Sequence, residues 1–234
     1  MLEKELKALY QVKNPVTKTR FHKENYVEGE IDYFVGINLP DLRNLAKKYK
    51  DEITKEELTN LIQDKIHEHR LLALLILSYQ MKEENQINQK DIVEFYLNNL
   101  IYVNNWDLVD VSAANILGRY FYNIEDYSLL YELSLSDNLW YKRISIVATW
   151  FLIDKNILEI TLDITDNLID EKHDLLHKAC GWMLRELGKK DIAMLNEYIE
   201  VNYQKMPRTM LRYAIEKHPK EIRKRILKGD FLWR

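Results

Sequence analysis

The sequence has very few of the residues that staple or bend a chain. Cys180 is the only cysteine, which excludes an internal disulfide and any multi-cysteine zinc or iron-sulfur site. A lone thiol suits a reducing compartment, so we expect a cytoplasmic protein. Only six glycines and four prolines occur in 234 residues. Turns should therefore be short and helices numerous.

Long hydrophobic runs are also absent. No apolar run approaches the roughly 20 residues that a membrane-spanning helix needs. The first residues, "MLEKELKALYQ", are amphipathic and mix acids with lysines, unlike a signal peptide. The chain is nevertheless 47% hydrophobic, which is enough for a core without a metal or a disulfide. We expect no membrane partner.

Apolar residues recur at helical spacing. The stretches "LLALLIL" (71–77), "ISIVATWFLI" (144–153) and "DLLHKACGWMLREL" (174–187) repeat at three and four, and no strand-like alternation is present. Thr54 and Glu57 have the spacing of a capping box, and Pro40 and Pro207 stand where helices can begin. The pattern predicts an all-α protein with a single domain, 1–234.

Five helices can be superposed on one another in sequence. Their equivalent positions are Arg70, Asp110, Arg143, Lys178 and Arg208. The intervals of 40, 33, 35 and 30 residues each fit a helix pair, and a second helical pattern lies between successive members at 89–100, 126–135, 160–170 and 191–203. This rhythm predicts HEAT-like helical repeats stacked in a curved superhelix, an α-α solenoid with a concave face.

Four of these equivalent positions are cationic, and we call them the basic row: Arg70, Arg143, Lys178 and Arg208. A basic row on the concave face of a solenoid would suit the phosphate backbone of DNA. Alternatively, these side chains lie near helix starts and pair with neighbouring acids. The formal net charge of -3 does not favour general nucleic-acid binding. Both termini are basic, however, which supports the DNA interpretation.

Tryptophans accompany the row. Trp106 precedes Asp110 by four residues and Trp182 follows Lys178 by four, so each indole shares a helical face with its reference position. Trp140 either does the same beside Arg143 or fixes the entry of its helix. Tryptophans in helical proteins usually pack in the core. Two of them on a face with one aspartate and several cations indicate a site.

Four stretches together resemble the AlkD-type DNA alkylation repair family, which consists of HEAT-like-repeat DNA glycosylases. They are "YFVGINLPDLRNLAKK", "NNWDLVD", "LWYKRISI" and "HKACGWMLRE", and their order and spacing match over roughly residues 20 to 215. The resemblance implies hydrolysis of the N-glycosidic bond of positively charged N3- and N7-alkylpurines in duplex DNA. It also implies that neither a metal nor a cofactor is used and that the base is not flipped, unlike in most glycosylases.

The resemblance also implies residue roles. It makes Asp110 the catalytic carboxylate, Trp106 and Trp182 its aromatic partners, and Arg143 a DNA contact. A tyrosine near the lesion corresponds to Tyr26, with an offset of one residue. A fixed carboxylate would stabilise the oxocarbenium charge of the breaking sugar bond, and electron-rich indole faces would add to that stabilisation.

Other residues near these motifs are assigned no catalytic role. Asp107 is the nearest rival carboxylate, but one residue turns it about 100° round the helix from the face of Trp106. His173 and His177 could share a helix face, but no third ligand is evident, and no glycine-rich phosphate loop is present. We expect no metal, cofactor or nucleotide. Cys180 should be a buried structural thiol, and "HEHR" (67–70) a partly exposed polar helix start.

The alternative function is a non-catalytic HEAT-like scaffold that binds DNA structures or a protein partner. In that interpretation the indoles of Trp106 and Trp182 only pack, and Arg143 neutralises Asp110. In the enzyme interpretation these side chains line one accessible cleft. We expect a monomer in either case, because a solenoid lying along DNA needs no partner.

Overall fold

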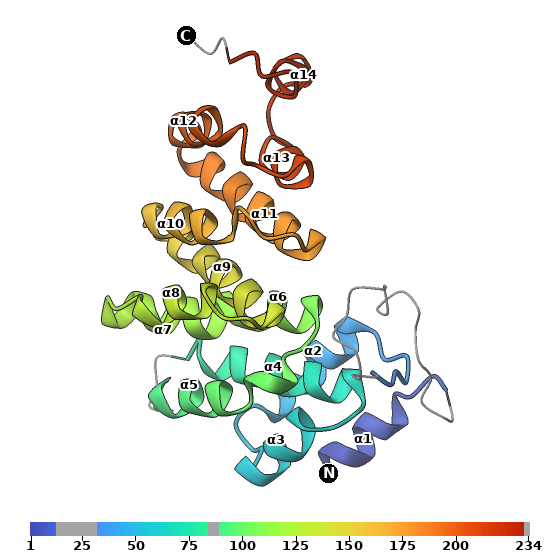
Figure 1. Cartoon of the computed structure of the whole chain (residues 1–234). Helices are drawn as coiled ribbons and strands as arrows, with labels where there is room; N and C mark the ends of the chain where they lie inside the picture. Colours follow the sequence, from blue (N-terminus) through green and yellow to red (C-terminus); the bar gives the residue numbers. More distant parts are fainter. Residues whose placement is uncertain (13–31, 84–88, 232–234) are drawn as a thin grey trace. The chain divides into compact units, whose positions relative to one another are not determined.

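The computed structural model describes residues 1–12, 32–83 and 89–231 (Figure 1). These residues form helices and no strand, and a single isolated bridge joins Tyr33 to Ile66. The all-α prediction is confirmed. The chain divides into two compact units, Met1–Ile116 and Leu117–Arg234, which are described separately below. The prediction of a single domain stays a prediction.

The first unit contains helices α1 to α6. Their bounds are α1 Leu2–Ala8, α2 Leu39–Tyr49, α3 Lys55–Ile62, α4 His67–Gln80, α5 Gln89–Asn98, the 3-10 helix η1 Leu100–Tyr102 and α6 Trp106–Ala113. Local sequence accounts for the helix starts. Asn38 caps α2 just before Pro40, and Thr54 and Glu57 form the predicted capping box at α3. The long helix α4 is buried along most of its length and forms the centre of this unit.

The second unit contains helices α7 to α14. Their bounds are α7 Arg119–Ile124, α8 Ser128–Ser134, α9 Leu139–Asp154, α10 Glu159–Leu168, α11 Asp174–Lys190, α12 Ile192–Asn202, α13 Arg208–Ala214 and α14 Lys220–Ile226. The short π-helix η2, Ala114–Gly118, precedes α7. None of the helices in the described ranges is long and apolar enough to cross a membrane.

The helix pairing agrees with the repeat pattern of the sequence. Each of the five equivalent positions falls in the first five residues of its helix, in α4, α6, α9, α11 and α13, and α5, α8, α10 and α12 occupy the intervening segments. In the first unit α4 packs on α6. In the second unit α9 packs on α11 and α11 on α13, with α8 and α10 alongside (Figure 1). The helical-repeat prediction therefore holds within each unit.

Helix α11 approaches α13 very closely at Gly181. A Cβ atom at this position would lie 2.5 Å from the carbonyl oxygen of Met210 and 2.5 Å from the Cβ of Tyr213. Only a glycine lets the two helices meet at this distance. The packing of α11, which carries Trp182, thus depends on the absence of one side chain.

Candidate functional site

Helix α6 carries Trp106 and Asp110 in its N-terminal half. Asn105 caps the helix, and its Oδ1 accepts a hydrogen bond from the Trp106 N–H at 2.8 Å. The buried residues of the helix are Leu108, Val109, Ser112 and Ala113. Trp106 and Asp110 remain partly exposed, one turn apart. The indole and the carboxylate therefore occupy neighbouring, partly exposed positions on one face of the helix.

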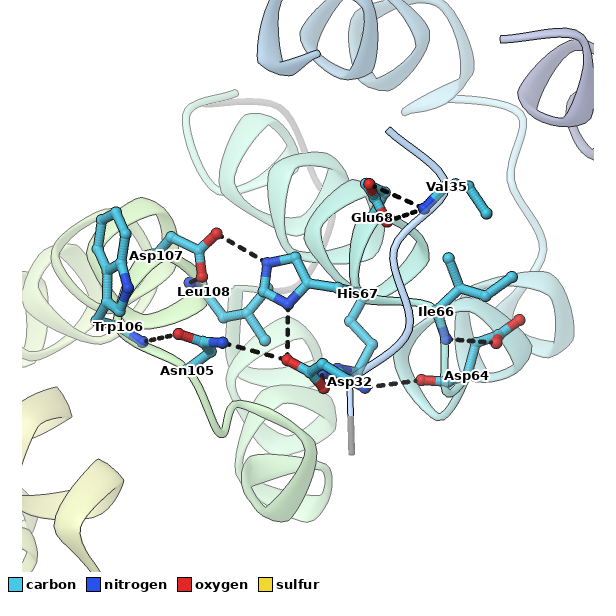
Figure 2. Close-up of polar contacts among 11 residues, drawn as sticks. Asp32, Val35, Asp64, Ile66, His67, Glu68, Asn105, Trp106, Asp107 and Leu108 are labelled. Carbon is cyan, nitrogen blue, oxygen red and sulfur yellow. Dashed lines mark hydrogen bonds and ion pairs between the residues drawn. The ribbon is translucent and has the colours of Figure 1, made fainter. Parts of the chain in front are cut away.

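Asp107 is the other carboxylate close to Trp106, and it forms hydrogen bonds within the protein. Its Oδ2 lies 2.8 Å from His67 Nε2, and its Oδ1 accepts the Leu108 N–H at 2.9 Å. The Asp107 side chain is 19% exposed. Because its carboxylate is held against His67 of α4, the Asp107 side chain points in a different direction from that of its neighbour Trp106 (Figure 2).

A buried polar network connects α6 to α4 and to the segment before α2, and it consists of Asp32, His67, Arg70, Asn105 and Asp107. Its centre is Asp32, whose Oδ1 accepts from the Arg70 guanidinium. Asp32 Oδ2 lies 3.0 Å from His67 Nδ1 and accepts from Asn105 Nδ2 at 3.1 Å (Figure 2). Asn105 in turn caps α6, so the network reaches the backbone of Trp106.

His67 is the only member of this network with an acid on both sides. Each ring nitrogen faces a carboxylate oxygen, and only the imidazolium form can donate to both. Burial by itself would lower the pKa of His67, but the hydrogen bonds and charges of Asp107 and Asp32 raise it to about 9. Burial likewise opposes ionisation of Asp32, yet His67 and Arg70 hold its pKa below the usual range.

The expectation of a partly exposed polar start at residues 67–70 is wrong. His67, Glu68, His69 and Arg70 are all between 2% and 6% exposed. The carboxylate of Glu68 accepts the backbone N–H groups of Val35 and Gly36, the latter at 2.8 Å. These polar side chains are buried because residues distant in the sequence supply their partners.

Arg70 accordingly departs from the predicted basic row. Its guanidinium is bound to Asp32 and donates to the carbonyl oxygen of Asp64 at 3.0 Å, and its side chain is 5% exposed. The alternative interpretation, pairing with an acid, describes this residue. Arg70 supports the helix start from inside the unit and is not on an accessible surface.

The remaining members of the basic row lie in the second unit and differ in exposure. Arg143 is 5% exposed, and its Nη1 donates to the carbonyl oxygen of Leu175 at 2.6 Å. Lys178 pairs with Asp174 at 2.5 Å, with 34% of its side chain exposed. Arg208 is exposed and donates to the carbonyl oxygen of Leu227 at 2.9 Å. The row is therefore not uniformly accessible.

Trp182 lies on α11 beside a second tryptophan. Its ring centroid is 5.2 Å from that of Trp150, with an angle of 58° between the rings. Trp182 is partly exposed, and Trp150 is 41% exposed. Trp140 is only 2% exposed and packs in the core, so it does not face an accessible site. Trp182 thus has an aromatic neighbour that sequence spacing did not identify.

The remaining residues considered from the sequence, Cys180, His173 and His177, make contacts within the protein. Cys180 is buried, and burial raises the pKa of its thiol to about 12. His173 caps α11, and His177 Nε2 donates to the carbonyl oxygen of Glu171 at 2.5 Å. No group of three or more potential metal-binding side chains occurs in the ranges that the structure describes. Tyr26 lies outside those ranges.

These features define a class of protein: an all-helical repeat protein in which one helix carries a partly exposed tryptophan and aspartate and another carries a partly exposed tryptophan. The sequence model of the DNA alkylation repair enzymes matches residues 2–218, and the chain belongs to that family. No curated protein is significantly similar to it in sequence.

Two solved structures resemble it in fold. One is a predicted DNA alkylation repair enzyme from Enterococcus faecalis, with 18% identity, a TM-score of 0.62, and coverage of 81% of this chain and 90% of that one. The other is smu.31 from Streptococcus mutans UA159, with 18% identity, a TM-score of 0.50, and coverage of 83% and 92% respectively. At this identity the likeness shows the helical-repeat fold alone.

Proposed function

We propose that this protein is a monofunctional DNA glycosylase that hydrolyses the N-glycosidic bond of cationic N3- and N7-alkylpurines in duplex DNA, without flipping the base. The observation that carries the proposal is the arrangement of Trp106 and Asp110 on α6, within a chain that matches the alkylation repair family over residues 2–218. No cofactor is part of the proposal, and a monomer suffices for it.

Asp110 is the proposed catalytic carboxylate. An alkylated purine is already cationic, so it departs with the electron pair of the C1′–N bond and becomes neutral without a general acid. Water adds to C1′ and loses a proton. The sugar is most positive in the transition state, and a fixed carboxylate beside it stabilises that state more than the ground state. The partly exposed position of Asp110 on α6 supports this role.

The indoles of Trp106 and Trp182 are the proposed aromatic contacts of the deoxyribose. Their faces are electron-rich and attract the positive charge that develops on the sugar. Both side chains are partly exposed in their own units. The ring of Trp150 beside Trp182 restricts the orientations open to that indole. Each indole can therefore be presented to DNA without rearrangement of its helix.

Arg143, Lys178 and Arg208 are the proposed phosphate contacts, and Tyr26 the proposed contact near the lesion. Lys178 and Arg208 keep enough exposure to approach a phosphate. Arg143 is held by the carbonyl oxygen of Leu175, which fixes its guanidinium in one orientation. Arg70 is left out of this set, because its guanidinium already forms an ion pair with the carboxylate of Asp32.

Replacement of Asp110 by asparagine tests the catalytic assignment. Release of 7-methylguanine and 3-methyladenine from methylated duplex DNA is measured with the wild type and Asp110→Asn. We expect the variant to lose about 100- to 1000-fold in rate while its affinity for the duplex stays similar, because one transition-state interaction is removed. Asp91→Asn, at an exposed position of α5, is the matched control. No release by the wild type, or equal release by Asp110→Asn, would reject the assignment.

Replacement of Arg143 tests the phosphate contacts. Arg143→Ala should weaken duplex binding and reduce the dependence of log Kd on log salt by about one unit. Arg185→Ala is the control, because Arg185 on the same helix as Trp182 pairs with Glu186 at 3.3 Å and with Glu216. Circular dichroism checks that each variant is folded. An unchanged salt slope would remove Arg143 from the DNA contacts.

The burial of Arg70 and Arg143 favours a second candidate function, a scaffold that binds DNA structures or a protein partner without excising bases. Fewer accessible cations remain than the sequence predicted, on a chain of net charge -3. The same assay separates the two functions. Binding to undamaged and methylated duplexes with equal affinity, without base release, would establish the scaffold.

A further inference from the structure

His67 joins three segments of the first unit that are distant in sequence. It belongs to the first turn of α4, its Nδ1 faces Asp32 at 3.0 Å, and its Nε2 faces Asp107 at 2.8 Å on the first turn of α6 (Figure 2). The ring of Phe34 stacks on the imidazole at a centroid distance of 4.7 Å. The imidazole side chain is 3% exposed. Its position is therefore fixed by two acids and one aromatic face.

The charges around His67 require the imidazolium form. Asp107 on α6 and Asp32 on the segment before α2 face the two nitrogens of the imidazole. On its own helix, Arg70 neutralises the second oxygen of Asp32, and Glu68 is bound to backbone N–H groups at Val35 and Gly36. A neutral imidazole would leave one lone pair against a carboxylate oxygen in a buried setting. Loss of one proton thus removes one of the two links.

Both neighbours of Trp106 in the sequence are attached to the network. Asn105, which caps α6, donates to Asp32, and Asp107 accepts from His67. The backbone of Trp106 is therefore held on both sides. Asp110 follows one turn later on the same helix, so its direction depends on the rotation of that first turn. A displacement of about 1 Å in a catalytic group can cost roughly 100-fold in rate.

We propose that His67 is a positioning residue for Trp106 and Asp110: by bridging Asp32 and Asp107 as an imidazolium, it fixes the first turn of α6 in the orientation that base excision requires. This inference rests on the proposed glycosylase function. His67 itself touches neither DNA nor the reacting atoms in this scheme.

Two substitutions separate the hydrogen bonds of His67 from its charge. In His67→Gln a single amide replaces the two ring donors, so one of the two carboxylates loses its partner. We expect the single-turnover excision rate to fall about 10- to 100-fold, while duplex affinity changes by less than about threefold.

Asp107→Asn is the rescue variant. The amide oxygen can still accept the Leu108 N–H, and the amide nitrogen can donate to the Nε2 of a neutral His67, which still donates to Asp32. We expect a rate within about threefold of the wild type at pH 7, because both connections are kept without the charge.

The pH profile distinguishes positioning from general destabilisation. The pKa of His67 is about 9, so the wild-type rate should fall as the pH rises through that value. Asp107→Asn should shift this decrease to lower pH or remove it, because one of the two acids that raise the pKa of His67 is gone. The comparison uses short incubations and an enzyme-free duplex at each pH, since alkylpurines are themselves altered by alkali.

His218→Gln is the matched control. His218 is a buried histidine of the second unit, and its Nε2 lies 2.8 Å from Asn196 Oδ1. Its replacement should change neither the excision rate nor the decrease near pH 9. A wild-type rate in His67→Gln, a loss confined to duplex affinity, or an unaltered alkaline decrease in Asp107→Asn would each overturn the proposal.

Hydrogen exchange makes the inference testable even if the proposed function fails. If the wild type releases no base, the glycosylase proposal falls, but the anchoring of α6 can still be measured. At pH 7, the amides of Trp106, Leu108 and Val109, which donate to Asn105 and Asp107, should exchange about tenfold faster in His67→Gln than in the wild type, with segments of the second unit unchanged. Equal exchange in the two proteins would show that His67 does not hold this turn.

Discussion

The two helices that carry the candidate residues are held by different physical means. The first turn of α6 is held by buried charges, through Asp32, His67 and Asp107. Helix α11 is held mainly by apolar contacts, with Cys180 and Leu184 in the core and Gly181 against α13, and its buried charged partner, Arg143, does not titrate in the ordinary pH range. Charge-assisted hydrogen bonds fix orientation but depend on protonation, whereas apolar packing does not. The two helices should therefore respond to different perturbations.

Removal of Asp32 should have the largest effect on stability. Asp32→Ala leaves Arg70, His67 and Asn105 without their shared acceptor inside the first unit. An uncompensated buried charge costs about 3–5 kcal/mol, measured as the change in the free energy of unfolding in urea. Glu221→Ala is the comparison, because its pair with Lys224 is exposed and should be worth less than about 1 kcal/mol. Similar losses in the two variants would mean that the buried network does not stabilise the unit.

A rise in pH should weaken the first unit through His67. Its folded pKa of about 9 lies above its ordinary value of 6.5, so its contribution is complete below about pH 6.5 and is lost as the pH rises through about 9. The difference in unfolding free energy between wild type and His67→Gln should shrink by about 2–3 kcal/mol between pH 6 and pH 9.5.

His218 in the second unit should respond in the opposite direction. Burial lowers its pKa below 6.5, so it contributes stability above that pH and loses it as the pH falls through the lowered value. The difference between wild type and His218→Gln should therefore be constant above pH 7 and shrink in acid. If the difference in unfolding free energy between wild type and variant shrank at alkaline pH for both histidines, the two units would not differ in their response to pH.

The helices, and the face shared by Trp106 and Asp110, can be predicted from the sequence, because both follow from the spacing of residues along a helix. The polar network around His67 cannot be predicted in this way. Asp32 and Asp107 lie 35 and 40 residues from His67, and nothing local marks them as its partners. The stretch "HEHR" reads as a polar helix start for the same reason. From sequence alone Arg70 and Arg143 are predicted at the surface, where most arginines lie, and only the fold shows the acceptors beside which they are buried.

Gly181 tests the packing of α11. In most helices a change from glycine to alanine raises the free energy of unfolding by up to about 1 kcal/mol. In Gly181→Ala the new Cβ would meet the backbone oxygen of Met210 at 2.5 Å, so we expect a net loss of about 1–3 kcal/mol. Gly188→Ala is the matched control on the same helix, because the three atoms nearest its new Cβ all belong to the side chain of Leu195, and the closest is the flexible Cδ2. Thermal unfolding of both variants measures the difference, and a gain in Gly181→Ala would show that the helices can separate without cost.

Trp150 offers the smallest and most specific perturbation of the second unit. Its ring lies 5.2 Å from that of Trp182 and is 41% exposed, so Trp150→Leu removes an aromatic contact with little loss of core. We expect a loss of about 0.5–1.5 kcal/mol in unfolding free energy, because an aromatic pair contributes that much beyond its buried area. The loss should be the same at pH 6 and pH 9.5, since no ionisable group takes part. A loss that grew with pH would couple Trp182 to a titrating residue and contradict the inference that the packing of α11 does not depend on protonation.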